Sequence, residues 1–196
     1  KTKPNEDILQ AYKAGHSIFG ENKVQELVQK WEALPKDIQW HMIGHVQRNK
    51  VKYMAEFVSL IHGVDSLKLL LEINKQAKKH NRKISCLLQI HIADEDTKFG
   101  LDESELNAII NSEEFKQLEN IKIVGVMGMA TFTSDKAQIR KEFKRLKRVF
   151  DHLKKSLADV SVLSMGMSGD YSIAIEEGST MVRIGSSIFG PRNYST

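Results

Sequence analysis

Two segments near the carboxyl end of the chain combine glycines with hydroxyl side chains in a pattern suited to binding an anion. One of them, SMGMSGD at residues 164–170, runs from an apolar stretch into Gly166, Ser168 and Gly169 before a helix that should begin near Asp170. Glycines let the backbone approach a ligand closely, and a helix start offers unpaired N–H groups at its positive dipole end. This chemistry suits a phosphate, although the same residues would also serve in an ordinary turn between a strand and a helix.

The second segment, MVRIGSSIFGPR at residues 181–192, places a cation beside further candidate phosphate ligands. Strand alternation sends Arg183 to the same face as Met181 and Gly185. If that face lines the inside of a barrel, the guanidinium needs an acceptor, either a ligand or a structural carboxylate. Gly185 and Ser186 would offer a backbone N–H and a hydroxyl, in the loop position where barrels commonly hold a phosphate.

Lysines open the chain, in the sequence KTKP at residues 1–4. A lysine at the carboxyl end of a strand, in the mouth of a barrel, can have its pKa lowered by burial and by nearby cations, and can then form a Schiff base. Taken alone, an N-terminal lysine is an ordinary exposed residue. Only proximity to the phosphate-binding loops would make Lys1 the nucleophile, with Lys3 as the competing amine.

Other polar residues stand at the ends of predicted strands. Asn22 lies in the segment GENKVQE, and His41 and His45 lie in WHMIGHVQRNK. The two histidines lack a third ligand at a compatible spacing, so we expect no metal. Lys98, in an acidic loop after a later strand, is a candidate second cation near the site.

The elements that must position these residues alternate between short apolar runs and longer amphipathic ones, which is the pattern of βα units around a parallel sheet. Several of the short runs are almost entirely apolar, as expected of strands buried on both faces. The apolar stripes of the helices are core faces, and we expect the lysines and arginines of residues 136–155 to be solvated. Seven strands are predicted, at residues 17–22, 40–44, 57–64, 84–92, 123–129, 162–168 and 181–189.

Seven strands are one fewer than a (β/α)8 TIM barrel requires. The chain begins at Lys1 without an initiator Met, and we expect the missing first strand to precede it. Lys1 would then be the last residue of that strand, at the rim where such barrels collect their chemistry. The predicted fold class is α/β, with residues 1–196 forming a single barrel domain.

Composition limits the class of protein. The 196 residues carry 29 basic against 25 acidic side chains, and the basic residues are spread along helices rather than gathered with aromatic ones, which argues against nucleic acid as a partner. No apolar stretch reaches the ~20 residues that a membrane span needs. Cys86 is the only cysteine and has no disulfide partner in the chain. We therefore expect a cytoplasmic protein with no membrane association.

Together these segments resemble the pyridoxal phosphate homeostasis protein family, whose members are relatives of the barrel domain of alanine racemase. The blocks that carry the resemblance are, in chain order, KTKP, FGENKVQE, WHMIGHVQRNK, and SMGMSGD with VRIGSSIFGPR. The chain departs from the family pattern in the motif GENK, where an aromatic or aliphatic residue is usual. It also has Ser186 where threonine is common, a change that keeps the hydroxyl group.

The resemblance implies a cofactor, pyridoxal 5′-phosphate (PLP), held as a Schiff base on Lys1. Arg183 would face the pyridine nitrogen of the cofactor. Because a guanidinium does not give up its proton, the ring would be a poorer electron sink than one that faces an aspartate. The other cofactor-binding residues would be Asn22 near the ring, and Ser168, Gly185 and Ser186 at the phosphate.

The function that the resemblance implies is intracellular homeostasis of PLP, in which a monomer buffers the reactive aldehyde and supplies it to apo-enzymes without turnover of its own. Racemases of this lineage take a second acid–base residue from an additional β domain and a dimer partner, whereas this chain ends at Thr196. An open site with one base suits storage better than stereoinversion. The alternatives are a PLP-dependent amino-acid racemase, a Schiff-base aldolase without cofactor, and a nucleic-acid-binding protein acting through the basic helix.

Overall fold

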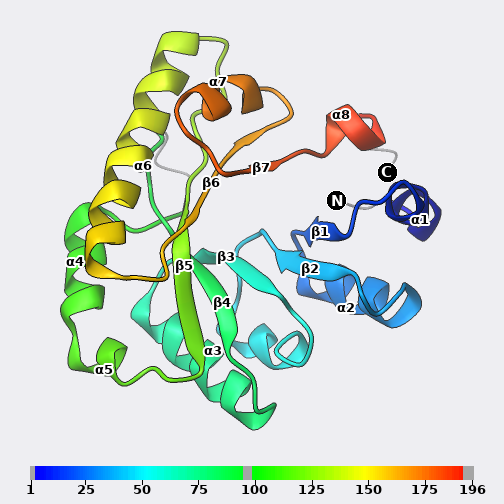
Figure 1. Ribbon diagram of the computed structural model, residues 1–196, viewed down its shortest axis with the longest axis horizontal. Coiled ribbons are helices and arrows are strands. Elements are labelled where there is room, and N and C mark those ends of the chain that lie inside the picture. The colour runs from blue at the N-terminus through cyan, green and yellow to red at the C-terminus, as the bar shows by residue number, and fades with distance from the viewer. Residues whose placement is uncertain (1–2, 95–98, 192–196) are drawn as a thin grey trace.

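The computed structural model describes residues 3–94 and 99–191 of the chain. Its strands form one sheet in which sequence order is also spatial order, and every neighbouring pair is parallel (Figure 1). The seven predicted strands are therefore confirmed. They are β1 (Ile18–Glu21), β2 (Gln39–Met42), β3 (Leu60–Val64), β4 (Ile84–Gln89), β5 (Ile121–Met127), β6 (Val162–Met167) and β7 (Met181–Arg183).

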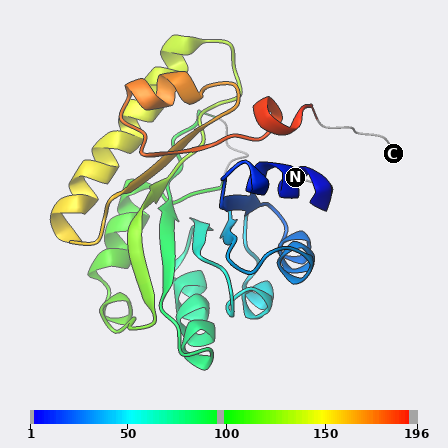
Figure 2. The same ribbon diagram turned by 45° about the vertical axis from the view of Figure 1, so that its right-hand side comes forward.

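Helices connect the strands and cover the outer face of the curved sheet (Figure 2). This βα alternation produces the parallel pairing, because each helix returns the chain to the same end of the sheet. The helices are α1 (Asn5–Lys13), α2 (Val24–Ala33), the 3-10 helix η1 (Arg48–Tyr53), α3 (Leu67–Lys79), α4 (Glu103–Asn111), α5 (Glu113–Lys116), α6 (Lys136–Ser156), α7 (Tyr171–Glu176) and α8 (Ser186–Phe189).

The last predicted strand is too long. It ends at Arg183, and the residues from Ser186 to Phe189 form the short helix α8, for which Gly185 is the N-cap. Short apolar runs do not distinguish a strand from a helical turn, and Ile184 and Ile188 are spaced four residues apart, as on a helix. The residues after β7 therefore begin a helix rather than continue the strand.

The sheet curves into a nearly closed barrel whose two edges are β1 and β7. Within the described ranges, each of these strands pairs with one neighbour only, β1 with β2 and β7 with β6. The carboxyl ends of all seven strands lie at the same rim, because the strands are parallel. Any residue placed at the end of a strand is therefore brought to that rim.

Alternation along the strands separates the apolar side chains into two clusters. The larger cluster packs between the sheet and the helices, where Ile61 and Val126 from strands meet Leu70 and Phe143 from helices. The smaller cluster comes from the opposite, inward face of the strands and fills part of the barrel interior. Its buried members are Leu60, Leu87 and Met127, and Val124, Met129, Val162 and Met181 pack against them.

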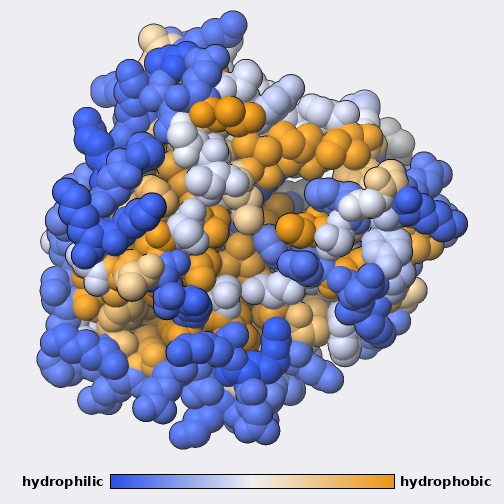
Figure 3. Space-filling view, viewed as in Figure 1, coloured by the Kyte–Doolittle hydropathy of each residue, from blue (hydrophilic) through white to orange (hydrophobic). Residues whose placement is uncertain are grey.

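Helix α6 has the apolar stripe that the sequence predicts. Ile139, Phe143, Leu146, Phe150 and Leu153 are all buried against the sheet. Hydrophilic side chains cover the outer helices, whereas hydrophobic ones gather along the chain that runs from β7 to α8 (Figure 3). Lys141, Lys144 and Lys154 of α6 are exposed, as the sequence predicts for its basic residues.

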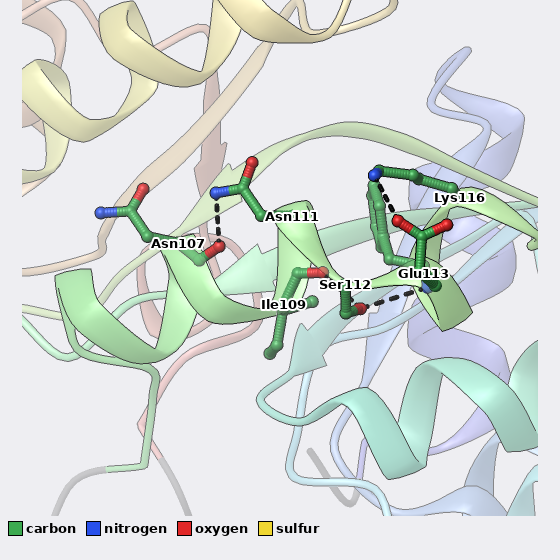
Figure 4. A network of polar contacts seen from close by, with 7 residues as sticks. Asn107, Ile109, Asn111, Ser112, Glu113 and Lys116 are labelled. Carbon is green, nitrogen blue, oxygen red and sulfur yellow. Dashed lines mark hydrogen bonds and ion pairs between the residues drawn. The ribbon is translucent and has the colours of Figure 1, made fainter.

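A single serine joins helices α4 and α5. The hydroxyl of Ser112 donates to the carbonyl of Ile109 at 2.8 Å, and its oxygen accepts from the backbone N–H of Phe115 at 3.2 Å (Figure 4). Ser112 thus ends one helix and caps the next, which lets the chain turn without leaving these groups unpaired. The connection between α4 and α5 is fixed in this way.

Candidate functional site

The site lies at the carboxyl ends of β6 and β7, where the two glycine-rich segments meet. After β6 the chain turns into α7 through Ser168, Gly169 and Asp170. The turn is held by a hydrogen bond of 2.6 Å from the backbone N–H of Met167 to Oδ1 of Asp170. Gly166 has a φ of +96°, and a Cβ added to it would lie 2.6 Å from the Cβ of Ala174. This position therefore requires glycine.

The hydroxyl of Ser168 is the meeting point of the two segments. Its oxygen accepts from the backbone N–H of Gly185 at 3.1 Å and from that of Ser187 at 3.3 Å. A side chain placed on Gly169 or Gly185 would meet nothing within 4 Å, so the space beside this hydroxyl is open. Because its oxygen accepts from these two groups, the Ser168 hydroxyl keeps its own proton to donate, and a hydroxyl donor beside open space suits an anion.

Arg183 lies one step deeper, at the end of β7. Its Nη1 donates to Oγ of Ser164 at 2.7 Å, and its Nη2 donates to the carbonyl of Gly128 at 3.2 Å. Burial lowers the pKa of the guanidinium to about 10, an effect that the charge of Asp170 opposes. Arg183 therefore stays protonated at neutral pH.

The expected inward orientation of Arg183 is confirmed. The expected alternative partner, a structural carboxylate, is not found among the described residues. In residues 3–94 and 99–191, no carboxylate lies within ion-pair distance of the guanidinium. Its two polar partners are a hydroxyl and a backbone carbonyl, both uncharged. The positive charge is thus available to a ligand.

Two histidines extend this polar contact across the barrel interior. Nδ1 of His62 lies 3.1 Å from Oγ of Ser164, and Nε2 of His62 lies 3.1 Å from Nδ1 of His41. Burial lowers the pKa of His41 to about 4. The pKa of His62 is also lowered well below its usual value, by burial first and then by the charges of Arg183 and His41.

The amino-terminal segment reaches the same side of the barrel. The Lys3 ammonium donates to the carbonyl of Phe189 and, at 3.3 Å, to that of Pro191. This contact joins the start of the described chain to the end of α8, where the helix dipole favours a cation. Lys1 and Lys98 lie outside the described residues.

Asn22 follows β1 at the rim, on the other edge of the open sheet. Its backbone oxygen packs closely against Gly44, where an added Cβ would come within 2.3 Å. The structure therefore brings Ser168 and Gly185 into contact, with Ser186 next along the chain and Arg183 below. Asn22 lies at the same rim but directly after β1, at the opposite edge of the sheet from β7.

His62 and Ser164 are site residues that the sequence reasoning missed. His62 stands in the apolar run FVSLIHGV, and its alternation with Leu60 places both on the inward face. The same argument that turned Arg183 inward would have found it. The described residues contain no group of three or more metal-ligating side chains that could hold an ion. No helix among them is both long and apolar enough to cross a membrane.

Comparison with known proteins places the chain in a family. Residues 6–193 match the alanine racemase N-terminal domain. The pyridoxal phosphate homeostasis protein of Aquifex aeolicus is 40% identical over 196 residues, which cover 99% of this chain and 85% of that protein. Its counterpart in Homo sapiens is 39% identical over 208 residues, covering 100% of this chain and 75% of the human protein.

Solved structures agree with this assignment. PipY of Synechococcus elongatus, solved with PLP bound, superimposes with a TM-score of 0.87 at 32% identity, covering 97% of this chain and 89% of PipY. Alanine racemase of Clostridium difficile has a TM-score of 0.77 at 18% identity, covering 97% of this chain and 48% of the racemase. The second likeness shows the barrel fold alone. The chain belongs to the pyridoxal phosphate homeostasis proteins, within the alanine racemase N-terminal domain family.

Proposed function

We propose that this chain binds PLP at the carboxyl rim of its barrel, as a Schiff base on Lys1, and buffers and supplies the cofactor inside the cell. The family to which the chain belongs supports this function, and so does the PLP bound to PipY. The observation that carries the proposal is the group formed by the Ser168 hydroxyl and the N–H groups of Gly185 and Ser187, beside an arginine without a contacting carboxylate in the described ranges.

The residues at this rim fit the parts of the cofactor. Ser168, Gly185 and Ser186 would hold the phosphate, since a hydroxyl and backbone N–H groups next to open space suit its oxygens. Arg183 would donate to the pyridine nitrogen, and Asn22 would lie near the ring. When bound, PLP supplies an aldehyde that an amine can hold reversibly and a ring that can withdraw electrons.

Arg183 would make the bound cofactor a weaker electron sink. Its pKa, about 10, lies well above neutral, so it would donate to the ring nitrogen without giving up its proton. A ring nitrogen that stays unprotonated withdraws electrons less strongly than one protonated by an acidic partner. We propose a carrier without turnover, and racemase activity is an outcome that the experiment below can detect.

The wider setting is part of the same proposal. We propose that the chain acts as a monomer in the cytoplasm and passes PLP to apo-enzymes. Cys86 is buried and burial raises the pKa of its thiol, so an unreactive cysteine is compatible with a reducing compartment.

The test compares the purified chain with Lys1→Ala and with Lys75→Ala, which alters an exposed lysine on α3. We expect titration with PLP to produce the visible absorbance of an imine-linked cofactor in the wild type and in Lys75→Ala. Lys1→Ala should lose this absorbance because the attaching amine is absent. A wild-type chain that leaves PLP free in solution would refute the function, and conversion of L- to D-alanine would make the chain a racemase.

A further inference from the structure

Four polar side chains form a continuous chain of contacts through the barrel interior. It runs from Arg183 on β7 to Ser164 on β6, at 2.7 Å, then to His62 on β3 and on to His41 on β2, each at 3.1 Å. Strands β3 and β6 are not neighbours in the sheet, so the contact between Ser164 and His62 crosses the interior. The contact therefore joins the two halves of the barrel.

This polar chain is shielded from water. Ser164 is 0% exposed, His62 is 1% exposed and His41 is 7% exposed. The inward apolar residues Leu60 and Met127 share the interior with them. Because water is excluded, the polar atoms of these side chains depend on one another for hydrogen bonds.

The contacts determine where the protons lie. Arg183 can only donate, so the oxygen of Ser164 accepts from it. Both histidines are neutral at pH 7, since burial lowers their pKa values. In the described part of the chain, the side chain of Ser164 has no hydrogen-bond partner other than Arg183 and His62.

Only one arrangement then gives the hydroxyl proton of Ser164 an acceptor. The hydroxyl donates to Nδ1 of His62, and the protonated Nε2 of His62 donates to Nδ1 of His41. In the reverse arrangement, His62 would donate to Ser164, whose own proton would be left buried without an acceptor. The geometry thus selects the Nε2–H tautomer for both histidines.

We propose that His62 is a positioning residue for Arg183, which acts through the Ser164 hydroxyl to aim the guanidinium at the ring nitrogen of bound PLP. The inference rests on the proposed function and adds to it a residue that is not among the proposed phosphate ligands Ser168, Gly185 and Ser186. By accepting the hydroxyl proton, His62 turns a lone pair of Ser164 toward Arg183. Without that acceptor the hydroxyl can rotate its proton toward the guanidinium, which cannot accept it.

Two substitutions at His62 separate a positioning role from a packing role. His62→Gln keeps an acceptor for Ser164 and a donor for His41, whereas His62→Leu fills the site with no polar atom. We expect His62→Leu to weaken PLP binding about tenfold and to shift the absorbance maximum of the bound cofactor, because the guanidinium loses its fixed direction. His62→Gln should stay within about threefold of the wild type, with its absorbance unshifted.

The controls separate this effect from unfolding. His80→Leu removes an exposed histidine at the end of α3 and should behave as the wild type. Thermal unfolding without cofactor is recorded for every variant. If His62→Leu does not fold, Ser164→Ala takes its place. It removes the hydroxyl that links His62 to Arg183 and should produce the same spectral shift.

The hydrogen bonds from Ser164 through His62 to His41 can also be tested without cofactor. Nitrogen NMR of the histidine rings should show both His62 and His41 as the Nε2–H tautomer near pH 7. The Nδ1–H tautomer at His62 would overturn the inference, and so would a folded His62→Leu or Ser164→Ala variant whose PLP affinity and absorbance equal those of the wild type. Failure of the wild type to bind PLP would instead overturn the proposed function.

Discussion

Ser168 is the residue on which the proposed phosphate site depends. Its hydroxyl oxygen accepts from two backbone N–H groups that lie after the next strand, and it thereby ties the end of β6 to the start of α8. The contact is exposed, so losing it should cost the fold little, whereas the hydroxyl keeps a proton that it can donate to a ligand. Its contribution should therefore appear in binding rather than in unfolding.

Replacing Ser168 by alanine tests this role. We expect Ser168→Ala to raise the dissociation constant for PLP about tenfold to a hundredfold, because one hydrogen bond to a charged phosphate is lost. The free energy of unfolding should change by less than about 1 kcal/mol, since the freed N–H groups can reach water. Ser172→Ala, which removes an exposed hydroxyl on α7, is the matched control for both measurements. An unchanged affinity in Ser168→Ala would place the phosphate elsewhere.

Residue-level reasoning predicted part of this site. The inward orientation of Arg183 followed from strand alternation, and the approach of Ser168 to Gly185 followed from two glycine-rich strand ends meeting at one rim. The contact between Ser164 and His62 could not be predicted in this way, because 102 residues separate them and they lie on strands that are not neighbours. The roles of these residues toward PLP remain predictions.

At the scale of elements, β5 and β6 approach so closely that residue 125 has no room for a side chain. A Cβ on Gly125 would lie 1.7 Å from the carbonyl oxygen of Val162, its partner across the parallel pair. That distance is far below contact, and the obstacle is backbone rather than a flexible side chain. Glycine at this position thus allows β6, which carries Ser164 and leads to Ser168, to pair with β5.

Gly125→Ala should therefore be severely destabilising. We expect it to lower the free energy of unfolding by about 3 kcal/mol or more, since the two strands must move apart to admit the methyl group. Gly169→Ala is the control, because a Cβ there meets nothing within 4 Å, and its effect should be within about 0.5 kcal/mol. Urea unfolding of both variants checks the difference. Equal stabilities would contradict the close packing of β5 and β6.

The presence of each strand was easier to predict from the sequence than its length. All seven strands were found from buried apolar runs, because a strand covered on both faces needs apolar residues throughout. The last strand was predicted to reach residue 189, but it ends at Arg183. The residues beyond it form a helical turn whose direction is set by Gly185 and by the contact with Ser168, which is a tertiary effect.

At the scale of the whole molecule, the barrel encloses a polar layer beside an apolar one. The helix-facing side of the sheet is apolar and belongs to one large cluster. The inward side combines an apolar cluster with His41, His62, Ser164 and Arg183. Two neutral histidines in the interior make the stability of the molecule sensitive to pH.

The sign of that sensitivity follows from the lowered pKa values. In the unfolded chain a histidine titrates near 6.5, whereas in the folded protein the pKa of His41 is about 4 and that of His62 is also lowered. The unfolded state therefore takes up protons first as the pH falls below 6.5, and the folded state loses stability down to about pH 4. His41 alone would contribute at most about 3 to 4 kcal/mol to this loss.

Urea unfolding of the cofactor-free protein at about pH 7 and about pH 5 measures the effect. We expect the wild type to lose more stability between these conditions than His41→Asn, which has no ring to protonate. His80→Gln, at an exposed position, should follow the wild type. The same loss in His41→Asn as in the wild type would mean that His41 is not protonated on unfolding.

The most direct test of the central claim is to identify the amine that carries PLP. The protein is loaded with PLP, reduced with borohydride to make the linkage permanent, digested, and mapped by mass spectrometry. We predict that the modified lysine is Lys1, because the nearby Lys3 already donates to the carbonyls of Phe189 and Pro191. Modification of Lys3 or of a distant surface lysine, with Lys1 unmodified, would contradict the account.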